Sequence, residues 1–425
     1  MPVRGKRILG RAVVCAAVLL LAHATAGQSG PTKVSGNDGP IPREYWGLHI
    51  HRAGALSAWP TVGFGSWRLW DARVTWADLE PQPGQWRFEA LDRYVELARE
   101  RNVEILLPLG MSPAWASARP GEVSSYGAGA TAEPADLRHW RNYVGTIARR
   151  YQGRVRHYEI WNEPNLKTFY TGSVATMVKL VREASIVLKE IDPAIVVVTP
   201  AATERGGLRW LDEFLGQGGA GPADVIGYHF YVAPAEPEAM VPLIREVQQI
   251  LRRNGVTRPL WNTESGWMIP SRQLGVKPRG GNGLYSRVLD DDDAAGFVVR
   301  SYVLHWALGV SRLYWYAWDN HLMGLVEPDG RTIKTAGRAY ETAWRWMNGA
   351  ELRGCEGAED QPWICRLTRG TGDEAWIVWS PKGRKGLAIP EAWRVRHVND
   401  LGGGRRALAA GERVEIGPLP LLLER

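Results

Sequence analysis

The sequence predicts an α/β fold, a (β/α)8 TIM barrel followed by a small C-terminal all-β domain. Eight short apolar runs alternate with stretches whose apolar residues recur at helical spacing, which is typical of parallel strands joined by helices. After Ala350 the helical spacing ends, and short apolar runs are separated by Gly, Asp and Pro residues. The chain has 425 residues, of which 45% are apolar, and this is enough for a large barrel with one appended domain.

The expected strands are apolar runs with β-branched and aromatic residues. They lie at 45–50, 66–70, 103–109, 155–161, 194–199, 224–230, 259–263 and 312–318. The expected helices lie at 53–62, 88–98, 137–151, 174–191, 243–251, 297–308 and 335–347. The connections at 111–134, 201–222 and 268–289 follow strands and are long, and barrels carry their functional residues on such loops.

Four segments are expected along the chain. Residues 1–26 resemble a secretory signal peptide, with a basic start, an apolar stretch at 12–22 and small residues at its end. Residues 27–42 are rich in Gly, Ser and Pro and are expected to form a flexible leader. The barrel is expected at 43–348 and a small β-sandwich-like domain at 350–425.

The signal predicts an exported protein, periplasmic or extracellular, with no stable membrane span after cleavage. An uncleaved anchor is the alternative, although the apolar stretch is short for a membrane span. The formal net charge of +7 falls to +3 without the four basic residues of the signal, so the charge balance does not indicate a nucleic-acid partner. No cofactor is expected.

The three cysteines separate into one and two. Cys15 lies in the expected signal, whereas Cys355 and Cys365 form an even pair in an exported chain and predict a disulfide. Two buried free thiols are the alternative. No metal-ligand spacing surrounds the pair, and no metal is expected.

The stretch Tyr158–Asn165 joins an expected strand to a loop. It reads Tyr-Glu-Ile-Trp-Asn-Glu-Pro-Asn, and Pro164 ends the strand, so Glu163 lies where the strand opens. A second carboxylate, Glu264, ends the later run Leu-Trp-Asn-Thr-Glu. A barrel brings distant strand ends to one pocket, and the two carboxylates are therefore expected to face each other.

These residues resemble a known group. Asn-Glu-Pro on one strand and a lone Glu on a later strand are similar to the clan A retaining glycoside hydrolases, and most of all to family 39 and its relatives, bacterial exopolysaccharide glycosidases among them. The resemblance covers residues 43–345 and implies a barrel with a following β domain. It implies a secreted hydrolase that cleaves O-glycosidic bonds of an oligo- or polysaccharide through a covalent glycosyl-enzyme intermediate.

The resemblance also implies roles at the centre of the site. Glu163 is the expected acid/base, and Glu264 is the expected nucleophile. Asn162 is expected to bind the sugar 2-hydroxyl, a contact that strengthens in the transition state. The structural alternatives are a solvated loop acid for Glu163 and a turn former for Asn162.

Residues on two further strands are expected to support the pair. Arg68 resembles the clan's arginine that keeps the nucleophile ionised, with a surface salt bridge as the alternative. His229 and Tyr231 end another strand, and Tyr231 is expected to hydrogen-bond Glu264. For both residues the alternative is a satisfied core position.

The 21 tryptophans include candidate sugar platforms, because the C–H face of a pyranose stacks on an aromatic ring. The candidates are Trp115, Trp267 and either Trp315 or Trp318. Trp318 is preferred because it lies nearer the strand end, and Asp319 beside it is expected to bind a hydroxyl.

Three other functions compete with hydrolysis. His49 and His51 have the His-x-His spacing of metal-dependent barrel hydrolases, but two ligands do not make a site, and His49 is instead placed among the candidate substrate-binding residues. A non-catalytic carbohydrate-binding barrel would not need both carboxylates. A transglycosylase would use the same intermediate with a sugar acceptor. Long loops and many tryptophans favour a polymeric substrate that is cut internally.

Overall fold

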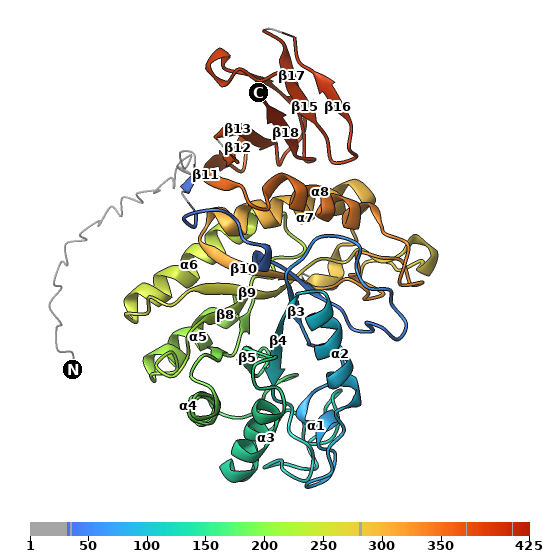
Figure 1. Ribbon diagram of the computed structural model, residues 1–425. Helices are drawn as coiled ribbons and strands as arrows, with labels where there is room; N and C mark the ends of the chain where they lie inside the picture. The colour runs from blue at the N-terminus through green and yellow to red at the C-terminus, as the bar shows by residue number, and fades with distance from the viewer. Residues whose placement is uncertain (1–31, 35, 280–282, 371, 410) are drawn as a thin grey trace, which may run out of the picture. The chain divides into compact units, whose positions relative to one another are not determined.

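The computed structural model describes residues 32–34, 36–279, 283–370, 372–409 and 411–425 (Figure 1). These described residues form one compact unit. The predicted signal peptide and the first residues of the predicted leader, 27–31, lie outside the described residues.

A nine-stranded parallel sheet forms the centre of this unit (Figure 1). Its strands are β2 (Trp46–His49), β3 (Ser66–Arg68), β4 (Glu104–Leu109), β5 (His157–Ile160), β6 (Val196–Val198), β7 (Ala202–Thr203), β8 (Ile226–His229), β9 (Leu260–Ser265) and β10 (Val310–Trp315). Their order is β6-β5-β4-β3-β2-β10-β9-β8-β7, and each of the eight expected runs overlaps one strand, while β7 lies in the connection expected at 201–222. Backbone hydrogen bonds from Thr199 to Val225 (3.0 Å) and from Val225 to Val197 (3.2 Å) also connect the β6 edge with the residues before β8, so the sheet is strongly curled.

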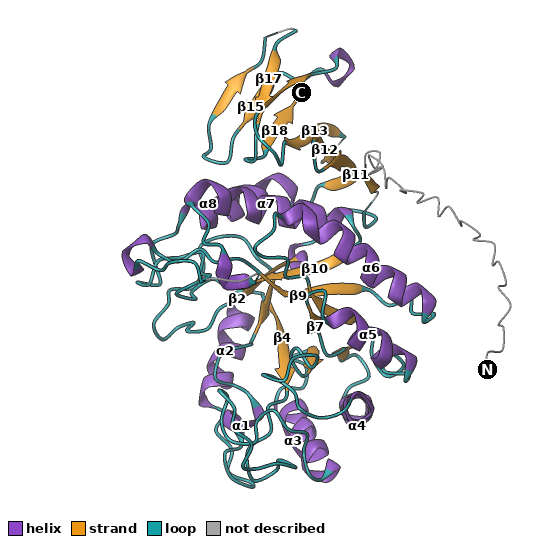
Figure 2. Cartoon of the chain, turned by 180° about the vertical axis from the view of Figure 1, so that it is seen from behind, coloured by secondary structure: helices purple, strands orange, loops and turns teal. Residues whose placement is uncertain are grey.

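Helices cover the outside of this sheet (Figure 2). They are α1 (Trp76–Leu79), α2 (Glu89–Glu100), α3 (Leu137–Arg150), α4 (Val174–Ile191), α5 (Gly207–Gly216), α6 (Met240–Arg253), α7 (Asp291–Ala307) and α8 (Thr335–Met347). Short 3-10 helices are η1 (Arg43–Tyr45), η2 (Pro237–Ala239), η3 (Arg272–Leu274), η4 (Leu284–Ser286) and η5 (Glu391–Trp393). In the described part of the chain, no helix combines the length and the apolar character that crossing a membrane requires.

Two helix predictions need correction. Residues 53–62 form a turn instead of a helix, in which the carbonyl of Arg52 accepts backbone hydrogen bonds from Ala55, Leu56 and Ser57. Gly54 has a φ of +68°, which the helix does not allow. In contrast, the long connection expected at 201–222 contains the helix α5. The glycines at both ends of this short amphipathic helix made the segment resemble a loop.

The C-terminal strands form two antiparallel sheets. Their bounds are β11 (Glu351–Ala358), β12 (Gln361–Arg369), β13 (Asp373–Trp379), β14 (Lys385–Ala388), β15 (His397–Asn399), β16 (Arg405–Ala407), β17 (Arg413–Ile416) and β18 (Leu421–Glu424). The larger sheet has the order β1-β11-β12-β13-β18-β15-β16, and β14 pairs with β17. An apolar cluster with Trp376, Val414 and Leu423 joins the two sheets.

The predicted flexible leader is wrong for part of its length. Its described residues include β1 (Thr32–Val34), which pairs antiparallel with β11 and forms an edge of the larger sheet. Ile41 is buried and exchanges backbone hydrogen bonds with Gly349 and Ala350. Backbone pairing with a strand far along the chain leaves no trace in local composition, so the Gly- and Pro-rich leader looked unstructured.

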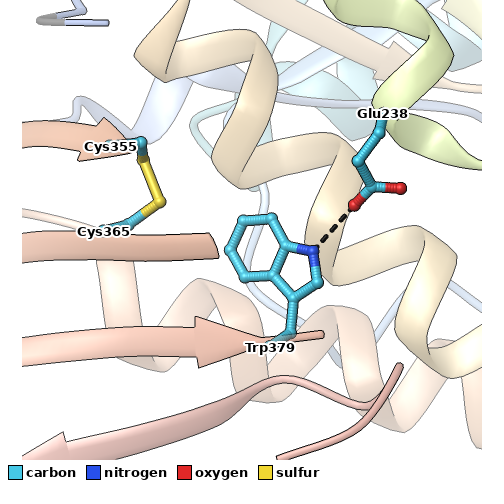
Figure 3. The surroundings of a disulfide bond; sticks show 4 residues. All are labelled: Glu238, Cys355, Cys365 and Trp379. Atoms are coloured by element: carbon cyan, nitrogen blue, oxygen red, sulfur yellow. Dashed lines mark hydrogen bonds between the residues drawn. A yellow bond between two sulfur atoms is a disulfide. The ribbon is translucent and has the colours of Figure 1, made fainter. Parts of the chain in front are cut away.

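A buried hydrogen bond between Trp379 and Glu238 is one of the contacts that attach the larger sheet to the helices (Figure 3). The indole of Trp379 donates to Oε1 of Glu238, 2.7 Å away, and Glu238 also pairs with the buried guanidinium of Arg300 on α7. Beside this point Cys355 and Cys365, directly opposite each other on β11 and β12, form a disulfide. The domain boundary predicted at 348–350 remains a prediction, because contacts such as that between Trp379 and Glu238 join the two predicted domains.

Candidate active site

The chain turns sharply where β5 ends. Trp161 has a φ of +67° and Glu163 a φ of +41°, values that few non-glycine residues adopt. Backbone hydrogen bonds hold the turn, from Trp161 to Leu109 (2.7 Å) and from Glu163 to Ala201 (3.0 Å). Pro164 then prevents the strand from continuing. The ends of the neighbouring strands therefore fix the backbone that carries Glu163.

Arg68, at the end of β3, joins side chains from two other strands. Its Nη1 donates to Oε2 of Glu264 at 2.8 Å, and its Nε donates to Oε2 of Glu159 at 2.6 Å. Its Nη2 donates to Oδ1 of Asn162 at 2.8 Å. All four residues are buried, so these charges interact with little screening by water.

Glu264, on β9, has a second partner in Tyr231. The hydroxyl of Tyr231 donates to Oε1 of Glu264 at 3.0 Å, and Arg68 holds the other oxygen. The amide nitrogen of Asn162 is buried and has no hydrogen-bond partner among the described residues. It therefore remains available to a ligand hydroxyl.

Glu163 faces a chain of polar groups that starts with His229. Nδ1 of His229 lies 2.8 Å from Oε1 of Glu163, and its Nε2 lies 3.0 Å from the hydroxyl of Thr263. That hydroxyl donates to Oε1 of Glu159 at 2.6 Å. Burial and the charge of Arg68 hold the pKa of His229 well below its usual value, so the imidazole is neutral.

The two carboxyl groups differ in what surrounds them. Burial raises the pKa of Glu163 to about 7. Burial and the charges of Glu163 and Asp71 also raise the pKa of Glu264 well above its usual value, although the adjacent Arg68 and the Tyr231 hydroxyl act in the opposite direction. Two carboxyl groups so close do not ionise together readily, and the two donors at Glu264 are the contacts that favour the charge there and the proton on Glu163.

The spacing of these groups limits their chemistry. Oxygens of Glu163 and Glu264 and a ring nitrogen of His229 all lie within 4.8 Å of one another. Retaining glycosidases hold their carboxyl groups about 5–5.5 Å apart and inverting enzymes about 6.5–9.5 Å apart, so the observed pair fits the retaining geometry. The same three groups are a possible donor set for a divalent cation, but Arg68 already supplies the positive charge beside Glu264, and we assign no metal ligand here.

Two tryptophans expected to stack on a sugar have no accessible face, and the structure corrects that prediction. Trp267 is fully buried, stacks on Trp315 with ring centroids 5.8 Å apart and donates to the carbonyl of Ala235 at 3.1 Å. Trp318 is 2% exposed, and its backbone is bonded to the carbonyl of His49 at 2.7 Å. Both rings belong to the hydrophobic core.

Trp115 is half-buried and is held by contacts with neighbouring side chains and backbone. Its ring packs edge-on against Trp76, and its indole donates to the carbonyl of Glu80 at 2.9 Å. The structure thus gives it a packing contact with α1.

Asp319 and His49 also hold structural contacts. Asp319 accepts from the backbone nitrogens of His51 and Arg52 at 2.8 and 2.9 Å, and it clamps the loop after β2. Nε2 of His49 lies 3.0 Å from the carbonyl of Thr263, and the ring is fully buried. Nδ1 of His49 is buried and has no hydrogen-bond partner among the described residues.

Three residues near the pair were not expected from the sequence. Asp71 accepts from the hydroxyls of Tyr316 (2.6 Å) and Tyr126 (3.2 Å), which come from the ends of β10 and from the loop after β4. Burial and the charges of Asp71 and Glu264 raise the pKa of Tyr316, which places it next to the site. Only their position just after strands or in a long loop could have indicated them.

The chain matches a family model described as glycosyl hydrolases family 39 over residues 69–262. That match includes Glu163 and ends two residues before Glu264. Among curated proteins, a β-xylosidase of Caldicellulosiruptor saccharolyticus is 28% identical over 152 residues, 34% of this chain and 31% of the relative. A β-xylosidase of Geobacillus stearothermophilus is 24% identical over 195 residues, 40% of this chain and 38% of the relative. The chain thus aligns with less than half the length of these relatives.

Similar solved structures cover nearly the whole chain. A monomeric β-xylosidase from Caulobacter crescentus has a TM-score of 0.62 and 16% identity and covers 92% of this chain and 97% of its own. A GH39 enzyme from Xanthomonas axonopodis pv. citri has a TM-score of 0.61 and 16% identity, with 95% and 99% covered. At this identity the likeness establishes the fold, a curled parallel sheet with helices and C-terminal β strands.

Together the matches confirm the recognition made from the sequence. The chain is similar to the clan A glycoside hydrolases. Within that clan the similarity is to family 39.

Proposed function

We propose that this protein is a retaining glycoside hydrolase in which Glu163 is the acid/base and Glu264 the nucleophile. The observation that carries the proposal is the buried pair itself, with its oxygens within 4.8 Å and the guanidinium of Arg68 bonded to Glu264. We also infer that the curled sheet closes as a (β/α)8 barrel. The hydrogen bonds between β6 and the residues before β8 support closure, and an experimental structure that lacked them would contradict it.

The reaction follows from the contacts of each carboxyl group. Glu264, charged beside Arg68, attacks the anomeric carbon while protonated Glu163 gives its proton to the departing oxygen. Once Glu264 is esterified its charge is gone, and Glu163 can accept a proton from the water that hydrolyses the intermediate. The free amide nitrogen of Asn162 binds the sugar 2-hydroxyl.

A neutral β-xyloside is the substrate that we propose first. Both curated relatives are named β-xylosidases. The guanidinium of Arg68 is already engaged by Glu264, Glu159 and Asn162, and Asp71 adds a further acid, so the surroundings do not favour a uronate. The substrate is an oligo- or polysaccharide of such units. If wild-type protein released only monosaccharide from a xylan, internal cutting would be ruled out.

The test uses aryl β-D-xylopyranosides with wild-type protein, Glu264→Ala and Glu163→Ala. We expect Glu264→Ala to lose at least about 10⁴-fold in kcat/KM. Added azide should give a glycosyl azide of inverted configuration with Glu264→Ala and of retained configuration with Glu163→Ala, because azide takes the place of a different carboxylate in each. Glu391→Gln, an exposed residue of η5, serves as the control with unchanged activity. Full activity in either alanine variant would end the proposal.

Transglycosylation is the second candidate, because it uses the same intermediate with a sugar acceptor. Product analysis with and without an added acceptor separates the two reactions. Longer products at the expense of hydrolysis would favour the transferase.

We further propose that the protein is exported and loses residues 1–26. The composition of that segment and the disulfide between Cys355 and Cys365 support this, since disulfides persist in oxidising compartments. N-terminal sequencing of protein recovered outside the cytoplasm should begin near residue 27. An intact N-terminus in the membrane fraction would instead support an anchor.

A further inference from the structure

We propose that Glu159, Thr263 and His229 form a hydrogen-bond relay that keeps a proton on Glu163, with Glu159 as the positioning residue at its buried end. The proposal deepens the proposed function, because it explains how the acid/base carboxyl keeps its proton while its neighbour is charged. In each hydrogen bond of the relay one group is the donor and the other the acceptor, and this assignment determines the donor and acceptor of the next bond.

The relay begins at Glu159 on β5. Its Oε2 accepts from Arg68 at 2.6 Å, and its Oε1 accepts from the hydroxyl of Thr263 at 2.6 Å. Glu159 is fully buried and lies on the same strand as the Asn-Glu-Pro turn, but neither of its oxygens is free for a ligand. A charged carboxylate offers only acceptors, so the single hydroxyl proton of Thr263 is committed to it.

The direction of this first bond determines the tautomer of His229. With its proton given to Glu159, the Thr263 oxygen can only accept from Nε2 of His229, 3.0 Å away. The imidazole is neutral, because burial and Arg68 disfavour its charged form. Its one proton is therefore on Nε2, and Nδ1 presents a lone pair.

The lone pair on Nδ1 points at Glu163. Oε1 of Glu163 lies 2.8 Å from Nδ1, and a charged carboxylate there would meet an acceptor. A proton on Glu163 turns the same contact into an O–H donor and an N acceptor. The relay thus favours the protonated form of Glu163 through bond direction, in addition to the effect of burial.

Other groups also face Glu163 and His229, and their effects on the pKa of these residues add to that of the relay. Asp71 raises the pKa of Glu163, whereas Arg68 and Thr203 lower it. Interactions with Glu163 further raise the pKa of Glu204, Glu264, Tyr126 and Tyr231, and His49 interacts with His229. None of these groups fixes the proton position on the imidazole, which the relay does.

Glu159 also connects the two carboxyl groups of the site. One of its oxygens holds the Arg68 that bonds Glu264, and the other starts the relay that ends at Glu163. Glu264 has a charged partner in Arg68, whereas Glu163 has a neutral chain of hydrogen-bonding groups. The first therefore favours the charged form of its carboxyl group, and the second favours the protonated form. This side chain accordingly sets the asymmetry of the pair without touching a substrate.

The test reads the tautomer and the proton directly, without a substrate. Long-range ¹H–¹⁵N spectra of full-length protein report which nitrogen of His229 is protonated, with His229→Gln used to assign the signals. Carboxyl ¹³C titration of glutamate-labelled protein reports the Glu163 midpoint, with Glu163→Gln used for assignment. Four proteins are compared: wild type, Thr263→Ser, Thr263→Val and Glu159→Gln.

We expect wild type and Thr263→Ser to show the Nε2–H tautomer and a Glu163 midpoint near 7. Thr263→Val removes the acceptor with little change in shape, so His229 should move to Nδ1–H and the Glu163 midpoint should fall by about one pH unit. In Glu159→Gln the amide oxygen must face Arg68, so its nitrogen donates to Thr263, the hydroxyl turns toward Nε2, and the same Nδ1–H tautomer appears. This variant reverses the relay instead of cutting it.

An Nδ1–H or charged imidazole in wild type at pH 6 would overturn the relay, and so would an unchanged tautomer in Thr263→Val. If the spectra agree but no glycoside is cleaved, the proposed function fails and the relay stands. If glycosides are cleaved but the tautomer does not respond, only the relay fails. Where hydrolysis is measurable, the alkaline limb of kcat/KM should shift with the ¹³C midpoint and return in Thr263→Ser.

Discussion

Glu163 and Glu264 are similarly buried, one just after β5 and the other on β9, but their partners have opposite chemistry. Glu264 is held by a guanidinium and a phenol, both of which donate to it. Glu163 is held by a neutral imidazole whose facing nitrogen is an acceptor. Burial alone would neutralise both carboxyl groups, so the difference between them comes from the direction of a few hydrogen bonds.

Loss of Arg68 should have the largest effect on the difference between the two carboxyl groups. Arg68→Met leaves Glu264 and Glu159 buried without a cation, and a buried charge that loses its partner costs about 3–5 kcal/mol. We expect a loss of that size in the free energy of unfolding by urea and a fall in kcat/KM of about a hundredfold to a thousandfold. Arg141→Met, which breaks a surface pair with Glu183, should cost under about 1 kcal/mol. Equal effects of the two substitutions would show that Arg68 has no special place.

Substitution of Tyr231 should have an intermediate effect, and it should change the ionisation of Glu264 but not that of Glu163. Tyr231→Phe removes one hydrogen bond to the charged carboxylate, which is worth about 1.5–3 kcal/mol, so kcat/KM should fall about tenfold to a hundredfold. The pKa of Glu264 should rise, and the acidic limb of the pH profile should move upward while the alkaline limb stays in place. Tyr302→Phe loses a buried hydroxyl bonded to the carbonyl of Gly47 and should leave both limbs unchanged. A shift of the alkaline limb in Tyr231→Phe would mean that the two sides are not separate.

The smallest effect concerns pH in the unaltered protein. Glu163 acts as an acid only while protonated, and its pKa is about 7. Activity should therefore be retained below neutral pH and fall about tenfold for each pH unit well above 7. Glu163→Gln carries no titrating group there, so its residual activity toward a substrate with a good leaving group should lose this limb. An alkaline limb that persists in that variant would belong to another residue.

The sequence predicted the strands better than the surroundings of the site. Parallel strands buried on both faces read as apolar runs, which is why eight of the nine were found, whereas the two-residue β7 was missed. The Asn-Glu-Pro turn made Glu163 recognisable. Arg68 and Tyr231 followed from the resemblance, and the structure brings both to Glu264. The glycine-flanked α5 was missed because its flanks look like a loop.

The errors at the site share one cause, since they depend on which way a side chain points beyond a strand end. Trp267 and Trp318 were expected to face a sugar, whereas the chain turns them into the core. Asp71 and Tyr316 lie where the alternation of strand faces has ended, so no periodicity predicts that they meet. Thr263 on β9 was named only as part of a strand, and its role depends on a proton that no sequence pattern records.

The bond between Trp379 and Glu238 has a practical consequence for anyone who wants to transplant the C-terminal strands. Glu238 belongs to η2, which follows the loop after Tyr231, and Trp379 is on β13. A truncation at residue 350 would strip the indole from this glutamate and uncover the Arg300 pair beneath it. The strands after α8 therefore cannot be exchanged as an independent unit. A chimera that replaces them must supply a new hydrogen-bond donor for Glu238.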